Sequence, residues 1–192
     1  MNRETQLTHP IRTFATAVLL SLSTAATATA GTVSYATGGA TLFHFDAPEG
    51  WEVVQGFEVT AAEMPEGTPP APRVVSLLPP GEDRIMWTGL WSPPEVGTFA
   101  EARDYLGKAV PRLLADPEVT YRDTRTVGGR EARIWSGVGT RGPRDMDFSI
   151  AAIRIAPGRI VLAAFIGEPE AWDRHQTELT AILNSIAPGT AR

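Results

Sequence analysis

The chain has 192 residues, of which 43% are hydrophobic and 20% charged, with a net charge of −5 and no cysteine. This composition is that of an ordinary globular protein with about one domain. The lack of cysteine excludes disulfides, thiol catalysis and thiolate metal sites, and the net acidity argues against a nucleic-acid partner.

The first thirty residues have the parts of a secretory signal peptide. Two arginines form a basic start, residues 14–26 are apolar and uncharged, and a small-x-small cleavage site ends at Ala30. The apolar stretch is shorter than the ~20 residues that a transmembrane helix needs. We therefore expect residues 1–30 to be removed. Residues 31–192 would then form a single periplasmic or secreted domain with no transmembrane segment.

The first half of this domain has the pattern of β structure. Residues 31–39 are small and polar and are expected to be disordered. Residues 63–72 hold four prolines and predict an irregular Pro-rich loop. Apolar alternation predicts strands at 40–45, 51–54 with a continuation at 57–61, 73–78 and 84–91.

Two helices interrupt the strand pattern. Thr98 and Glu101 have the spacing of a capping box at the start of the first helix. Pro111 lies inside the apolar repeat of this helix and predicts a kink or an early end. The second helix is predicted to begin at Pro169, which suits a first helical turn, and to end before Pro188.

The last third of the chain predicts a four-stranded antiparallel meander. Glycine-containing turn signals separate apolar-alternating runs at Val119–Thr126, Glu131–Val138, Asp145–Ile155 and Arg159–Gly167. The last run is apolar on both faces, so it should be covered on both sides. The predicted fold class is α+β: a single antiparallel sheet of about six to seven strands with helices packed on both faces.

Two segments carry a resemblance to a known family. They are Phe45-Asp46-Ala47-Pro48-Glu49-Gly50-Trp51 and the hairpin Val127-Gly128-Gly129-Arg130-Glu131-Ala132. With the order of elements, they resemble the superfamily typified by PsbP of photosystem II, the Ran-binding protein Mog and bacterial periplasmic proteins such as DcrB. The resemblance implies an α/β/α sandwich and a non-catalytic accessory or binding role. It supplies no active site that could be transferred to this chain.

Residues 137–142 match the glycine fingerprint of dinucleotide-binding proteins, but a strand pattern follows where that motif needs a helix. We expect these glycines to form a hairpin turn, and we predict neither a cofactor nor a metal site. After cleavage, His44 and His175 are the two remaining histidines. A cofactor-free hydrolase or lyase that uses His44 or His175 with a nearby carboxylate is therefore an alternative function.

Charge and aromatic residues indicate a candidate surface. Residues 40–118 hold thirteen acidic and five basic side chains, whereas residues 119–159 hold eight arginines and four acids. The basic meander either complements the acidic half or binds a protein or an anionic envelope partner. Trp87 and Trp91 share one strand face and form either core or a stacking platform. The candidate ligand or partner residues are Trp87, Trp91, Arg122, Arg125, Arg130 and Arg133.

These observations favour an exported, non-catalytic binding or accessory protein of the cell envelope. A second alternative is a carrier of a small apolar or sugar ligand, held between the sheet and the first helix. Pro111 would leave a gap at that place, and a cavity lined by Trp87 would favour this function.

Overall fold

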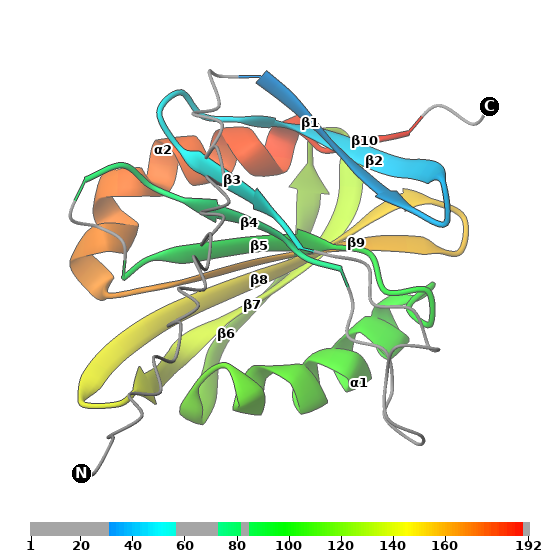
Figure 1. Ribbon diagram of the computed structural model, residues 1–192. Helices are drawn as coiled ribbons and strands as arrows, with labels where there is room; N and C mark the ends of the chain where they lie inside the picture. Colours follow the sequence, from blue (N-terminus) through cyan, green and yellow to red (C-terminus); the bar gives the residue numbers. More distant parts are fainter. Residues whose placement is uncertain (1–30, 57–72, 82–84, 190–192) are drawn as a thin grey trace, which may run out of the picture.

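The computed structural model describes residues 31–56, 73–81 and 85–189 (Figure 1). The predicted signal peptide, the Pro-rich loop and the strand continuation at 57–61 lie outside the described residues. The elements are β1 Gly31–Thr37, β2 Ala40–Ala47, β3 Glu52–Gln55, β4 Val75–Leu78, β5 Trp87–Trp91, α1 Phe99–Ala109, the 3-10 turn Val110–Arg112, β6 Ala115–Val127, β7 Arg130–Arg141, β8 Arg144–Ala156, β9 Arg159–Gly167, α2 Pro169–Ser185 and β10 Ala187–Pro188.

The described strands form two antiparallel sheets. The small sheet has the order β1-β2-β10, and the large sheet has the order β3-β4-β5-β9-β8-β7-β6. The prediction of a single sheet is therefore wrong. The large sheet has the predicted size, with α1 against one face, and α2 with the small sheet against the other (Figure 1).

The predicted meander is confirmed as the half of the large sheet that β6, β7, β8 and β9 form in sequence order. Its three turns contain Gly128, Gly142 and Gly158, whose φ angles are 53°, 61° and 67°. Glycine has no Cβ and adopts this left-handed conformation without the strain that other residues meet. The glycines therefore fix where each hairpin turns.

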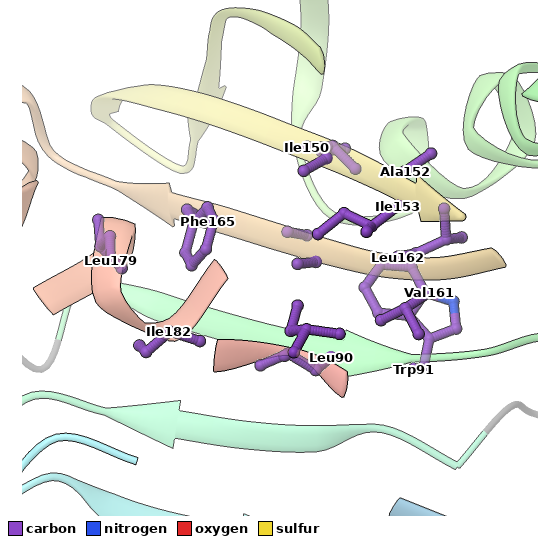
Figure 2. Close-up of a cluster of buried hydrophobic side chains, with 14 of the residues drawn as sticks. Leu90, Trp91, Ile150, Ala152, Ile153, Val161, Leu162, Phe165, Leu179 and Ile182 are labelled. Carbon is purple, nitrogen blue, oxygen red and sulfur yellow. The ribbon is translucent and has the colours of Figure 1, made fainter. Parts of the chain in front are cut away.

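The core of the large sheet lies on both faces of β8 and β9 (Figure 2). On the α1 face, Ala152 lies opposite Leu162, and both are fully buried. On the other face, the ring of Phe165 meets the edge of Trp172 in α2 at 5.9 Å between centroids. Coverage by a helix on each side explains why β9 is apolar at almost every position.

The start of α1 has the predicted capping box. The Thr98 hydroxyl accepts from the amide of Glu101 at 3.2 Å, and the Glu101 carboxylate accepts from the amides of Gly97 and Thr98 at 3.0 Å each. These bonds lower the pKa of Glu101, that of Gly97 most. Pro111 lies in the 3-10 turn that ends the helix, as predicted. Neither described helix is long and apolar enough to span a bilayer.

The predicted disorder of residues 31–39 is wrong, because they form β1 and a tight turn into β2. Tyr35 is 1% exposed, its ring stacks on Phe43 at 4.7 Å, and its hydroxyl donates to the carbonyl of Arg73 at 2.9 Å. A single buried aromatic residue thus anchors an otherwise small, polar segment.

The C-terminal end of α2 joins the small sheet to the large one. The Ser185 hydroxyl accepts from the amide of Asp46 in β2 at 2.9 Å. The side-chain oxygen of Asn184 accepts from the amide of Gly128 at the β6–β7 turn, also at 2.9 Å. These bonds fix both sheets to one helix end.

Candidate functional site

The two tryptophans of β5 lie on the α1 face of the large sheet. Trp91 is 4% exposed and belongs to the core. Trp87 is half-buried, and its indole nitrogen donates to the Ser76 hydroxyl at 3.0 Å. Its ring covers Gly89 so closely that a Cβ there would overlap it. The indoles of β5 therefore pack inward.

The structure divides the four candidate arginines among three places. Arg122 and Arg133 lie on the α1 face, since Arg122 is paired with Trp135 and Arg133 with the inward-facing Ala152. Arg125 lies on the opposite face, where it forms an ion pair with Asp123 at 3.0 Å. Arg130 is at the β6–β7 turn and donates to the Gly128 carbonyl at 2.7 Å. These residues do not form one basic surface.

Arg122 and Arg133 instead border a cleft beneath α1. A hollow of about 260 Å³ opens between the second half of α1, the 3-10 turn and the strands β6, β7 and β8. We call it the apolar hollow. Its lining includes Leu106, Val110, Val119, Trp135, Phe148 and Ile150, with Arg103 and Arg122 at its side. Trp135 is half-buried, whereas Phe148 and Ile150 are 2% and 1% exposed.

Two sequence features shape the elements around the apolar hollow. Pro111 ends α1 early, so a short 3-10 turn takes the place of a further α-helical turn there. On β7, alternation from Trp135 places Gly137 and Gly139 on the same face. A Cβ at Gly137 would overlap the carbonyl oxygen of Glu118 in the bulged part of β6, so β6 folds closely over this strand.

The glycines of the fingerprint at 137–142 have two different places in the structure. Only Gly142 has a positive φ, whereas Gly137 and Gly139 lie inside β7, so the expectation that all three form a turn is wrong. The strand β8 follows the motif, as its sequence pattern predicts. A helix N-terminus that could meet a pyrophosphate does not follow these glycines.

A second hollow of about 460 Å³ continues from the first along α1. We call it the arginine hollow. Arg103, Arg122 and Trp135 line both hollows, and Arg133 and Phe99 line the second. The guanidinium of Arg133 lies 4.9 Å from the centre of the Phe99 ring, a cation–π contact that holds it beside the helix.

Most charges near the arginine hollow have partners. Asp104 pairs with Arg103 at 2.9 Å, and Glu131 pairs with Arg154 at 3.0 Å. Arg122 and Arg133, by contrast, form no ion pair with any residue that the structure describes. The cleft thus joins an apolar end to a cationic end.

The histidines lie away from this cleft. His175 is on α2, where its ring meets the edge of Trp51 at 5.3 Å between centroids. His44 is half-buried on β2, opposite Ser34 and Ala187. The hydrolase or lyase alternative remains a hypothesis, and no contact described for either imidazole supports it. Among the described residues, no group of histidines and carboxylates could hold a metal ion.

One carboxylate has a raised pKa, at a place remote from the cleft. Burial raises the pKa of Asp147 on β8, and the negative charges of Asp173 and Glu170 on α2 raise it further. Glu170 and Asp173 both belong to the start of α2, which packs on the opposite side of the sheet from the apolar hollow.

Comparison with known proteins supports the fold. No family model matches the sequence, and no curated protein matches it significantly. Cyanobacterial PsbP from Synechocystis has a TM-score of 0.52 at 15% identity, covering 85% of this chain and 95% of that chain. LpqN from Mycobacterium tuberculosis, involved in cell envelope biogenesis, has a TM-score of 0.49 at 10% identity, with coverages of 83% and 90%. A score below 0.5 adds nothing to the assignment.

The PsbP-like fold that the resemblance implied is confirmed by the first of these structures. At 15% identity the likeness concerns the fold alone. The resemblance to Mog and DcrB stays a prediction.

Sequence reasoning missed Trp135, which lines both hollows. A signal was present in the chain, because Arg133, Trp135, Gly137 and Gly139 alternate along one strand. A large aromatic residue followed by two glycines on one strand face is the pattern of a position where a neighbouring strand or loop approaches the backbone closely. The strand register determines that this face of β7 lies toward α1.

Proposed function

We propose that this chain is an exported, non-catalytic binding protein of the cell envelope that holds a small apolar ligand beneath α1. Residues 1–30 support export, and the PsbP-like fold is compatible with an accessory role. The observation that carries the binding proposal is the apolar hollow, with its half-buried tryptophan floor.

The size and lining of the apolar hollow limit the ligand. Its volume of about 260 Å³ is near the lower end of the ~300–1,000 Å³ that ligand pockets usually have. Protein interiors are otherwise close-packed, so an opening of this size beside an aromatic ring is a distinct feature. The apolar hollow therefore suits a ligand with a single slender apolar group. The small-ligand carrier that Pro111 indicated is therefore the favoured form of the binding function. The cavity is lined by Trp135, whereas the sequence had suggested Trp87.

Filling the apolar hollow tests this proposal. Gly107 lines it, and a Cβ at Gly107 would meet no heavy atom within 4 Å, so Gly107→Phe can be introduced without a clash at its base. We expect the wild-type chain to bind the neutral fluorescent probe N-phenyl-1-naphthylamine. Gly107→Phe should weaken this binding by about tenfold or more, the loss expected when an apolar contact surface is blocked.

Lys108→Phe is the matched control, because it adds the same ring one position along the exposed part of α1. It should bind the probe as the wild type does. The proposal is wrong if the wild type does not bind the probe, or if Gly107→Phe and Lys108→Phe bind it equally.

Export has a separate test. Expression of the full chain in a Gram-negative bacterium should yield a periplasmic product, and mass spectrometry should show that it begins at Gly31. A product that keeps residues 1–30 would contradict the export proposal and leave the binding proposal unchanged.

A further inference from the structure

We propose that the arginine hollow binds the phosphate headgroup of a single-chain lipid, whose acyl chain lies in the apolar hollow. This inference rests on the proposed function and names its ligand class. Three features of the cleft support it: the spacing of Arg122 and Arg133, the pairing of the surrounding acids, and the continuity of the two hollows.

Strand register brings the two arginines together. Arg122 is directly opposite Trp135, and Arg133 is two residues from Trp135 on the same face of β7. Diagonal neighbours of this kind lie roughly 7–8 Å apart, within reach of long side chains. Two arginines at such diagonal positions can both bind one anion, and the planar arrangement of their N–H donors suits phosphate oxygens. The rings of Phe99 and Trp135 also line this hollow.

Charge balance favours phosphate over a carboxylate. The acids of this region already have cationic partners: Asp123, which also borders the arginine hollow, pairs with Arg125, and Asp104 pairs with Arg103. Arg122 and Arg133 thus contribute two positive charges that form no ion pair within the described residues. A phosphate monoester carries about −1.5 to −2 charges at neutral pH, which matches them.

The two hollows share Arg103, Arg122 and Trp135, so a ligand can occupy both at once. At one end the lining is aliphatic and aromatic, and at the other it is cationic. A molecule complementary to both ends has one apolar chain and an anionic head. The apolar hollow has the volume for one slender chain, which excludes a two-chain lipid lying fully inside it.

Binding of dodecyl phosphate, measured by titration calorimetry below its micelle concentration, tests the assignment. The wild-type chain should bind it at least about tenfold more tightly than dodecyltrimethylammonium, which has the same chain and the opposite charge. Inorganic phosphate alone should bind at least about tenfold more weakly than dodecyl phosphate, because it makes no apolar contact.

The double variant Arg122→Gln with Arg133→Gln should lose about tenfold or more in affinity for dodecyl phosphate. Arg125→Gln is the control for Arg122→Gln, since it removes one arginine charge from the same strand, β6, on the opposite face. It should bind dodecyl phosphate within about twofold of the wild type, as expected for a screened distant charge. Both proteins should still bind the neutral naphthylamine probe, which shows that they are folded and that the apolar hollow is intact.

The outcomes separate the two proposals. If the naphthylamine probe binds but dodecyl phosphate and dodecyltrimethylammonium bind equally, the headgroup assignment is overturned and the apolar site remains. Equal affinity for inorganic phosphate and dodecyl phosphate would overturn the lipid assignment. An unchanged affinity of the double variant for dodecyl phosphate would also overturn it. Failure of the probe itself to bind would overturn the proposed function.

Discussion

The strands β9 and β6 belong to the same sheet, yet their environments are opposite. Of the nine residues of β9, only Arg159 is exposed, whereas of the thirteen residues of β6 only Val127 is buried. β9 lies between α1 and α2, while β6 forms an edge that neither helix covers fully (Figure 1). Coverage by helices thus decides which strands stabilise the fold and which present side chains. We call β8 and β9 the covered half of the meander, and β6 and β7 its exposed half.

The largest effect is expected in the covered half. Leu162→Ala removes a side chain that is 0% exposed and should lower the free energy of unfolding by about 2–5 kcal/mol. Denaturant titration would measure it. Tyr121→Ala is the comparison on β6, where the side chain is 52% exposed, and should cost no more than about 0.5 kcal/mol. Similar losses in both variants would show that the two halves contribute equally.

An intermediate effect is expected at Gly137 in the exposed half, where β6 approaches β7 closely. Gly137→Ala would place a Cβ against the backbone of Glu118, and the forced shift should cost about 1–3 kcal/mol. Gly107→Ala, in open space on α1, should instead gain up to about 1 kcal/mol. Thermal or denaturant unfolding would compare the two, and equal effects would contradict the close approach of β6 and β7.

The smallest effect concerns Asp147, at the border between the halves. Its pKa is raised in the folded state, so its negative charge destabilises the fold at neutral pH, and this cost falls as the pH drops through the folded pKa. Asp147→Asn should therefore stabilise the protein at pH 7, by less than about 1 kcal/mol because solvent screens the charges.

The gain in the free energy of unfolding from Asp147→Asn should become smaller as the pH is lowered toward the ordinary pKa of aspartate. Unfolding curves from pH 4 to 7 would show the trend. Asp145→Asn removes the same charge at an exposed position of β8 and should change the stability less. A gain that grew on acidification would contradict the sign of the pKa shift.

The covered half could be predicted from the sequence, because its determinants are local. A few neighbouring residues are enough to recognise a turn glycine such as Gly158 or the capping pair Thr98 and Glu101. The small sheet could not be predicted, since β1 is held by a distant contact between Tyr35 and Arg73. β10, with two residues, has no pattern of its own.

The candidate site could be predicted only in part. Arg122 and Arg125 are three residues apart, and an odd spacing on a strand already places them on opposite faces. That Arg122 shares a hollow with Arg133 depends on the pairing of β6 with β7, which bulges shift near Val119. Register shifts of this kind depend on backbone contacts such as that at Gly137, and a hydrophobic pattern does not encode them.

The small sheet takes its strands from segments far apart in the chain. β1 and β2 form a local hairpin, but β10 reaches β2 only after α2, and the bond from Asp46 to Ser185 joins residues 139 positions apart. Contacts of such long range form late and slow the folding of a domain. During synthesis, the edge of β2 that pairs with Ala187 and Pro188 must therefore stay open until α2 and β10 have been made.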